Sequence, residues 1–300
     1  MFKFSVPQKV FNIGGVNIGG QPGEYPTVLI GSIFFAGHNI VSDPEKGLFD
    51  KDKARQLLER ESQISAITGN PRFIDVIGTT SEALINYIEF IAENTTSPIL
   101  VDSPSQKVRL ATIMHFSGTE VIPRLIYNAI AEDYTDEELT VLRDCGVKSS
   151  IVLAFSNKAV KPQAKIRLLE DKLLPAATEA GIENILIDMG VMDVPSISWV
   201  SLAINEVKEK LGYPAGCAPA NAIYTWKNMK ARGTPAFQAG ASAVLSMPVL
   251  LGADFILYGS LNNAPWVYPA VATTDGLIAY GNRFTGVQVQ STEHPLYKIF

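Results

Sequence analysis

The sequence predicts an α/β fold, a (β/α)₈ TIM barrel, from two regularities. Short apolar runs that end in a polar side chain recur along the chain, as at 97–103, where Asp102 and Ser103 follow Ile99–Val101. Parallel strands buried on both faces have this composition, and their carboxyl ends form the functional rim of a barrel. The polar residues that end these runs are 26 to 37 residues apart, the length of one strand and one helix, at Asp75, Asp102, Asn128, Ser156, Asp188, Asn221 and Tyr258.

With the apolar run at 28–35, these positions give eight strands, the number that closes such a barrel. An open, doubly wound sheet is the alternative, but no GxGxxG string follows the first strand. We therefore expect residues 1–300 to form one domain. Its first segment, 1–27, contains five glycines and three prolines and is expected to be irregular, with room for short strands that cap the barrel floor.

Helix signals separate the predicted strands. The segment 52–68 places apolar residues on one face and stops at a Gly-Asn-Pro string. Capping boxes at Thr79–Glu82 and Thr135–Glu138 predict two further helix starts. An apolar stripe over 197–211 predicts another helix, which a glycine then ends.

Two other stretches bear on function. The polar loop at 36–50 is longer than a usual βα connection, so it is a candidate for substrate contact. The apolar run at 239–258 approaches the length of a membrane span. Pro248, Gly252 and Asp254 divide that run into a helix and a strand, and we expect no membrane span.

Composition narrows the function classes. The chain is 47% apolar and only 18% charged, which predicts a large interior and a buried subunit interface. Its net charge of −5 comes from interspersed acids and bases, so there is no basic patch for nucleic acid. Cys145 and Cys217 form no CxxC motif, and the N-terminus does not resemble a signal peptide, which together indicate the cytoplasm.

The predicted rim is rich in acceptors and amides and lacks an evident nucleophile. No lysine ends a predicted strand, so a Schiff-base mechanism is disfavoured. His38, His115 and His294 lack metal-site spacing, and Cys217 has no base in evidence and is expected to pack. The candidate residues are Asp75, Asp102, Ser103, Asn128, Ser156, Asn157, Asp188 and Asn221.

Such a set suits a heterocycle with adjacent N–H donors, such as the 2-amino-4-oxo edge of a pterin. A carboxylate can accept two parallel hydrogen bonds from that edge. The alternative is that these acids cap helices or coordinate a divalent ion. Their number favours a ligand.

The chain resembles the H subunit of tetrahydromethanopterin S-methyltransferase and the bacterial methylcorrinoid:tetrahydrofolate methyltransferases, over nearly its full length. More distantly it resembles pterin-binding barrels, including dihydropteroate synthase, in which Asp, Asn, Asp and Asn follow the third, fourth, sixth and seventh strands. Asp102, Asn128, Asp188 and Asn221 match those places, although the string around Asn221 departs from the family pattern. The strings that carry the resemblance are Ile18–Thr27, Gly37–Asp43 with Phe49 and Asp50, Thr68–Pro71, Val101–Ser103, Gly252–Gly259, and Thr274 with Asp275.

The resemblance implies methyl transfer between a corrinoid cobalt and N5 of tetrahydrofolate or tetrahydromethanopterin. Asn221 and Asp102 are then expected to act in catalysis, and Asp188, Asn128, Asp102, Ser103 and Asp75 to bind the reduced pterin. No cobalt-ligating DxHxxG string occurs, so a partner corrinoid protein is expected to carry the cobalamin. The related barrels also imply a homodimer.

The sequence leaves two alternatives open. One is an enzyme like dihydropteroate synthase, and the other is a pterin-binding subunit active only within a larger complex. The sequence does not specify which of the two pterins is bound, the direction of transfer or the corrinoid partner. It also does not show whether the loop from His38 to Asp50 contacts the substrate.

Overall fold

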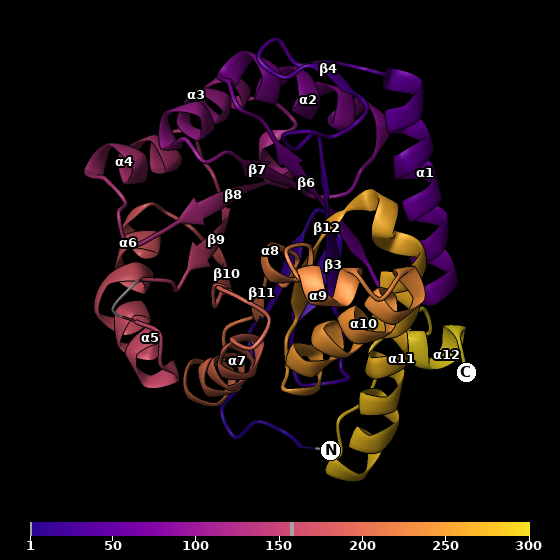
Figure 1. The fold of residues 1–300 in the computed structure, drawn as a ribbon. Coiled ribbons are helices and arrows are strands. Elements are labelled where there is room, and N and C mark those ends of the chain that lie inside the picture. Colours follow the sequence, from indigo (N-terminus) through magenta and orange to yellow (C-terminus); the bar gives the residue numbers. More distant parts are fainter. Residues whose placement is uncertain (1, 157–158) are drawn as a thin grey trace.

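A computed structural model describes residues 2–156 and 159–300, and it confirms the barrel. Eight parallel strands close in the order β10-β11-β12-β3-β6-β7-β8-β9, so the open-sheet alternative is wrong (Figure 1). The strands are β3 (Val28–Ile33), β6 (Arg72–Ile77), β7 (Ile99–Asp102), β8 (Leu125–Ile130), β9 (Ser149–Leu153), β10 (Asn184–Asp188), β11 (Ala215–Cys217) and β12 (Phe255–Ser260).

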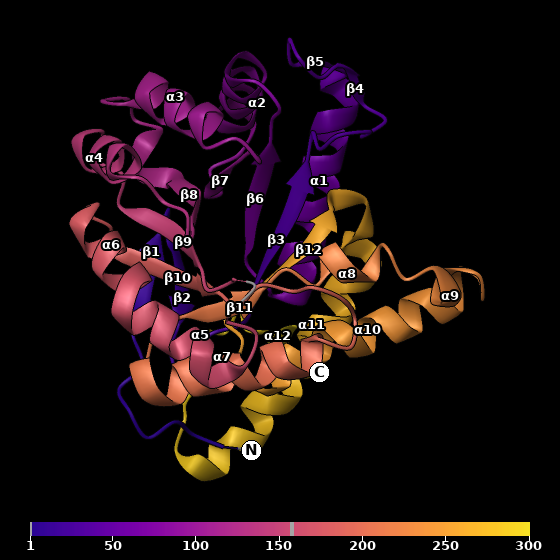
Figure 2. The same cartoon turned by 60° about the vertical axis from the view of Figure 1, so that its left-hand side comes forward.

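Helices cover the outside of the barrel, as a second view shows (Figure 2). No helix among residues 2–156 and 159–300 is long and apolar enough to cross a membrane, and the apolar run at 239–258 divides into α10 and β12 as expected. The helices are α1 (Lys51–Thr68), α2 (Ser81–Asn94), α3 (Gln106–Phe116), α4 (Asp136–Asp144), α5 (Pro162–Leu168), α6 (Leu174–Glu179), α7 (Ile197–Leu211), α8 (Ala220–Ile223), α9 (Lys227–Lys230), α10 (Thr234–Leu250), α11 (Ala264–Asn282) and α12 (Pro295–Lys298).

The predicted helix starts are correct to within two residues, but their caps differ in detail. Thr80, one residue beyond the predicted cap, accepts from the backbone N–H of Ala83. Thr135 caps α4 as expected and accepts from the N–H of Glu138 at 3.2 Å. In a capping box the Glu138 carboxylate would accept from the backbone N–H of Thr135. Here the carboxylate is buried and accepts instead from Tyr127 and from Gln106.

The N-terminal segment is largely irregular, as expected, and it contains the short strands for which the prediction left room. Strands β1 (Val10–Ile13) and β2 (Val16–Gly19) form an antiparallel hairpin. Ile13 and Ile18 from this hairpin join the apolar cluster inside the barrel, together with Phe73 and Phe255. The hairpin therefore closes the barrel floor, and a larger apolar cluster lies between the strands and the helices.

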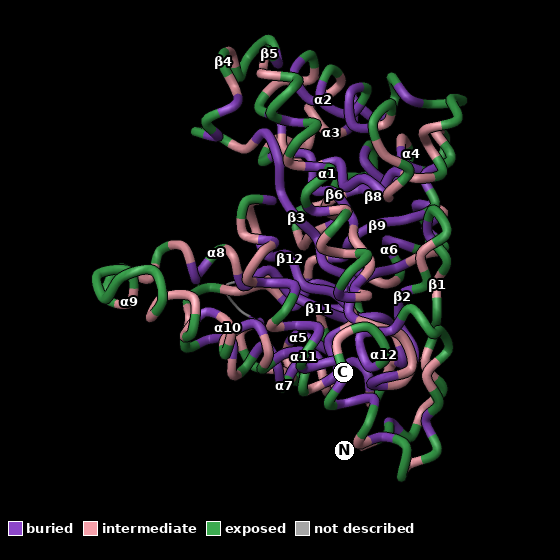
Figure 3. The backbone as a smooth tube through the Cα atoms, turned by 90° about the vertical axis from the view of Figure 1, so that its right-hand side faces the viewer, coloured by how far each residue is buried: buried purple, intermediate pink, exposed green. Residues whose placement is uncertain are grey.

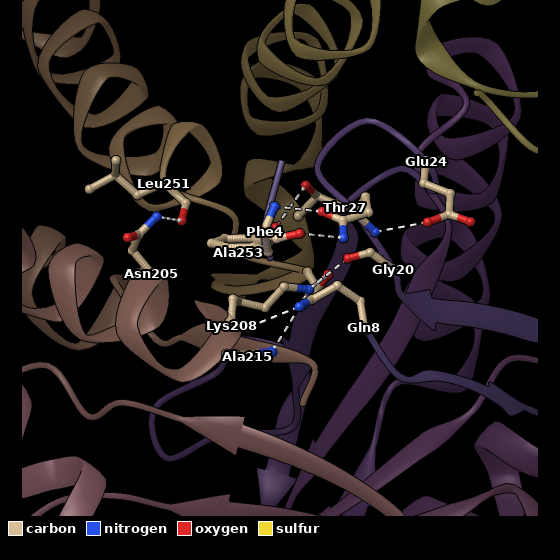
Figure 4. Close-up of polar contacts among 12 residues, drawn as sticks. Phe4, Gln8, Gly20, Glu24, Thr27, Asn205, Lys208, Ala215, Leu251 and Ala253 are labelled. Atoms are coloured by element: carbon tan, nitrogen blue, oxygen red, sulfur yellow. Dashed lines mark hydrogen bonds and ion pairs between the residues drawn. The ribbon is translucent and has the colours of Figure 1, made fainter. Parts of the chain in front are cut away.

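A buried ion pair lies at the same end of the barrel, and Figure 4 shows one member of it, Lys208, close to Gly20 and Ala215. Lys208 on α7 donates to both oxygens of Asp254 at 2.7 Å and to the carbonyl of Gly20 at 2.9 Å. Asp254 also accepts from the N–H of Ala215 at 2.9 Å, so one carboxylate links β11, β12 and α7. Polar residues at the floor of such barrels serve stability, and the opposite, carboxyl end is where ligands bind.

Figure 3 shows that the barrel strands are buried and that α9 projects from the molecule as an exposed turn. The projection follows β11, the shortest barrel strand, and returns through α10. Strand β3 is followed instead by a second hairpin, β4 (Val41–Asp43) and β5 (Leu48–Phe49). These two excursions flank the mouth of the barrel.

Candidate functional site

A cavity of about 460 Å³ opens at the carboxyl ends of the strands. It brings together six of the predicted rim residues on one surface. They are Asp75, Asp102, Ser103, Asn128, Asp188 and Asn221, and Ser32, Gln106, Arg109 and Glu138 join them.

Three residues that were predicted to end a strand at the rim lie elsewhere in the structure. Strand β11 ends at Cys217, and Asn221 lies on α8. Pro219 has no N–H to donate to a neighbouring strand, and it is the N-cap of α8. Tyr258 is not at the rim, because its side chain faces outward and donates to Glu61 at 2.6 Å. Ser156 is buried and does not line this cavity, and Asn157 lies outside the described residues.

Cys217 lies at the end of β11 with no exposed surface and packs in the apolar cluster outside the barrel. Burial and the nearby charge of Asp188 raise the pKa of its thiol well above the ordinary value. A thiol that is buried and protonated is a poor nucleophile. Its environment therefore fits the expected packing role.

Asp75 and Asp102 form a pair of neighbouring acids. Ser32 donates to one oxygen of Asp75 at 2.7 Å. Burial raises the pKa of Asp75 well above the ordinary value, and the charge of Asp102 raises it further. Burial also raises the pKa of Asp102 to about 6, because the opposing effect of Arg109 only partly offsets it. Two buried acids side by side resist carrying two negative charges, so the pair favours one proton shared between Asp75 and Asp102.

Asp188 at the end of β10 is the other buried acid of the cavity. One of its oxygens accepts from the N–H of Gly190 at 2.7 Å, which leaves the second oxygen available to a ligand. Burial raises the pKa of Asp188 to about 6, and the Gly190 N–H and the charge of Lys165 oppose that rise. At neutral pH Asp188 is therefore an ionised acceptor that little water reaches.

Lys165 is a residue that sequence reasoning missed. It is buried on α5, and its ammonium donates to the carbonyls of Ala154 at 2.7 Å and Met189 at 2.5 Å. Burial lowers its pKa to about 8. Lys165 thereby joins the loops after β9 and β10 and places a positive charge near Asp188. The sequence around Lys165 does not predict these hydrogen bonds, because they form only when α5 packs on the barrel.

Arg109 and Glu138 were also missed, because they lie on helices and not at strand ends. Arg109 donates to the carbonyl of Ser103 at 2.6 Å and lies 3.5 Å from the Glu138 carboxylate. Glu138 also accepts from Gln106 at 2.6 Å and from the Tyr127 hydroxyl. This cluster fixes the loop after β7 and presents a guanidinium to the cavity.

Comparison with known proteins adds to this geometry. The family model of the tetrahydromethanopterin S-methyltransferase MtrH subunit matches residues 6–290. The chain is 36% identical to the H subunit of tetrahydromethanopterin S-methyltransferase from Methanopyrus kandleri, over 96% of each chain. It is 37% identical to the H subunit of the putative methyltransferase mtx from Methanosarcina mazei, over 93% of this chain and 94% of that relative.

Solved structures agree on the fold. A dihydropteroate synthase from Xanthomonas albilineans superposes with a TM-score of 0.62 over 90% of this chain and 98% of that chain, at 17% identity. At that identity the likeness supports the barrel alone. The sequence matches are full length and well above that level, and they confirm the predicted resemblance to the H subunit. The chain therefore belongs to the MtrH family of tetrahydromethanopterin S-methyltransferase subunits.

Proposed function

We propose that this chain is a methyltransferase that moves a methyl group between N5 of a tetrahydropterin and a corrinoid carried by a partner protein. The observation that carries the proposal is the convergence of Asp75, Asp102, Asn128 and Asp188 in one cavity of about 460 Å³. The family of the chain supports the same activity.

Asp188 is assigned to the pterin's N–H edge. The oxygen that accepts from Gly190 keeps a second acceptor site, so the two oxygens of the buried carboxylate can accept from the ring N–H and the exocyclic amine, one each. Asn128, Ser103 and Asp75 line the same space and are assigned to the rest of the ring. Such a clamp fixes the ring, and orienting two reactants can lower a barrier by about 7 to 11 kcal/mol.

The acid pair is assigned to the proton at N5. Transfer away from the pterin needs N5 protonated or strongly hydrogen-bonded, and transfer to the pterin needs a group that receives the N5 proton. Burial raises the pKa of both Asp75 and Asp102, which favours one proton shared between them, and such a pair can serve in either direction. Asn221 lies at the exposed mouth on α8, and its amide is assigned to polarise N5.

The corrinoid is expected to arrive at the open mouth on a separate protein, and its cobalt supplies or receives the methyl group. Such an encounter must be transient, because the corrinoid protein must also bind a second enzyme, the one that exchanges the methyl group with the corrinoid in the other half of the cycle. Both cysteines of the chain are free, which suits the reducing cytoplasm where we place the protein.

Calorimetric titration with tetrahydromethanopterin and with tetrahydrofolate tests the proposal and names the pterin. Tetrahydromethanopterin is the first choice, because the names of the curated relatives specify it. We expect saturable binding of at least one of the two pterins with one site per chain. Absence of binding to both would contradict the assignment of the cavity.

Asn221→Ala is expected to lower turnover at least about tenfold while it changes the pterin dissociation constant less than about threefold. An interaction that strengthens at the reacting atom appears in the rate more than in binding. Single-turnover methyl transfer and calorimetry on the same variant make the comparison. Equal losses in both quantities would mean that Asn221 only positions the ring.

Pterin affinity is expected to depend on pH through Asp188. Its pKa is raised to about 6, so the carboxylate that accepts from the ligand is present above that pH and is lost below it. The dissociation constant should rise about tenfold per pH unit below pH 6 and stay level between pH 7 and 8. Titrations of wild type and Asp188→Asn at each pH separate this effect from protonation of the ligand. An equal pH dependence in both proteins would contradict it.

We also propose that the chain forms a homodimer through α10 and α11. These neighbouring helices pack on each other and expose no charged side chain. The exposed positions are Thr234, Pro235, Ala239, Ala243, Met247 and Leu250 on α10 and Pro269, Thr273, Leu277 and Tyr280 on α11. Uncharged, largely apolar faces of this kind mark protein interfaces, and twofold dimers are the commonest oligomers.

Light scattering of the purified chain is expected to report a dimer. Leu277→Glu should shift the particle toward a monomer, because it places a charge on the uncharged face. Met114→Glu introduces the same charge at an exposed position of α3 and should leave the dimer intact. A monomeric wild type would contradict the proposal.

A further inference from the structure

A second chamber of about 440 Å³ adjoins the acidic cavity. Both spaces are lined by Ser32, Ile77 and Asn221, so a ligand that fills the first can continue into the second. The second chamber differs in chemistry, because the rings of Phe35 and Tyr224 replace the carboxylates. Paired aromatic walls suit a flat aromatic group.

Phe35 follows an unusual turn at the end of β3. The preceding residue, Phe34, has φ +65°, a left-handed conformation that bulky side chains rarely adopt. Its ring stacks on Tyr87 of α2, with centroids 4.2 Å apart and planes 12° from parallel. The surrounding packing therefore holds Phe34 in this conformation, and the turn directs the next residue toward the mouth.

His38 closes this turn. Its Nδ1 accepts from the backbone N–H of Phe34 at 3.1 Å, and its own backbone N–H donates to the carbonyl of Phe35 at 2.9 Å. The imidazole also stacks on the Phe35 ring, with centroids 4.5 Å apart and planes 13° from parallel. His38 is 4% exposed, so its Nδ1 and the face of its ring make these contacts inside the protein and not with solvent.

The loop that carries His38 is anchored to α2 and the turn before it. Thr79, Thr80 and Asn86 donate from their side chains to the carbonyls of Pro44, Glu45 and Lys46, at 2.9, 2.5 and 2.9 Å. None of residues 36–50, all of which the structure describes, lines either chamber. The loop therefore lines neither chamber, and it reaches the site through the contacts of His38 with Phe35.

We propose that His38 is a positioning residue that holds the Phe35 ring against the second chamber, and that this ring packs on the aryl group attached to the bound tetrahydropterin. The inference rests on the proposed function, because it takes the pterin ring to lie in the first chamber. It gives the loop from His38 to Asp50 a role in substrate specificity. Tetrahydropterins that carry an arylamine arm are then preferred to those that end at the pterin ring.

The test compares two ligands, tetrahydrofolate and 6-methyltetrahydropterin, which lacks the aryl arm. Phe35→Leu removes the ring and keeps an apolar side chain, and it should weaken tetrahydrofolate binding about fivefold to tenfold. Binding of 6-methyltetrahydropterin should change less than about twofold, because the first chamber is untouched. Calorimetry measures both, and thermal unfolding confirms that each variant is folded.

His38→Ala should reproduce the pattern of Phe35→Leu, since it removes the acceptor and the ring that supports Phe35. His38→Asn supplies a side-chain oxygen near the place of Nδ1 and should recover part of the tetrahydrofolate affinity. Equal losses for both ligands, or no loss for either, would overturn the proposal. A wild type that binds 6-methyltetrahydropterin as tightly as tetrahydrofolate would overturn the aryl subsite and leave the pterin assignment standing. If tetrahydromethanopterin binds and tetrahydrofolate does not, it takes the place of tetrahydrofolate in this comparison. Failure to bind any of the three pterins would overturn both.

Discussion

Replacing Asp102 with asparagine is expected to lower the rate of methyl transfer by about two orders of magnitude or more. A positioned general acid or base typically accelerates a reaction by at least that factor. The amide keeps the shape of the side chain but cannot share a proton with Asp75. It also removes the negative charge that raises the pKa of Asp75, so the pH dependence of the rate should shift toward lower pH. Single-turnover kinetics at several pH values measure both effects.

Asp171→Asn makes the same chemical change at an exposed position between α5 and α6, and it should leave the rate unchanged. Pterin binding by Asp102→Asn should weaken less than its turnover. An Asp102→Asn protein with a wild-type rate and pH profile would remove the acid pair from the mechanism.

Asp188→Ala is expected to raise the pterin dissociation constant at least about tenfold. The carboxylate serves two donors of the ligand, and each donor left unpaired in a buried site costs about 1 to 3 kcal/mol. Two such losses together correspond to a factor of about thirty at the lower end and of about ten thousand or more at the upper end. Calorimetric titration with the preferred pterin measures the change.

Asp188→Asn separates ligand binding from fold stability. Burial raises the folded-state pKa of Asp188 to about 6, so folding favours its protonated form, and that contribution to stability is lost as pH rises from the ordinary value through 6. A neutral amide removes this loss, so Asp188→Asn should unfold at a temperature no lower than wild type at pH 7. A large drop in unfolding temperature with unchanged pterin affinity would make Asp188 a structural residue instead.

The sequence predicted the acids of the site because strand ends are visible in it. Asp75, Asp102 and Asp188 each end or interrupt an apolar run, and a closed parallel barrel brings such positions together. Tyr258 was misplaced for a simple geometric reason. Alternate residues of a strand face opposite sides, and β12 continues to Ser260, so Tyr258 points into the helical layer.

The remaining site residues depend on tertiary packing. Arg109 and Glu138 lie on helices and line the cavity only because those helices pack at a particular height on the barrel. Lys165 likewise reaches the loops after β9 and β10 only through the packing of α5. A polar residue on a partly apolar helix face is an ordinary feature of sequences, so none of the three gave a signal. Glu138 was even assigned to a capping box, a local pattern that its buried contacts override.

The hairpin at the barrel floor was within reach of the sequence. Gly14 and Gly15 stand between Ile13 and Val16 and have φ of 55° and 86°, the conformation of a two-residue hairpin turn. The prediction left room for short strands at the floor, but it took the glycines as turn residues and did not place a hairpin at them. A Gly-Gly pair between apolar residues predicts a hairpin directly.

The central claim is that this chain catalyses methyl transfer between a tetrahydropterin and a corrinoid, and the visible spectrum of the corrinoid tests it most directly. Methylcobalamin is mixed with purified protein and either tetrahydromethanopterin or tetrahydrofolate. We predict demethylation of the corrinoid that requires both the pterin and the protein and that is lost in Asp102→Asn. A spectrum that stays unchanged with both pterins, for a protein that binds one of them, would contradict the claim and leave a pterin-binding subunit that is active only within a larger complex.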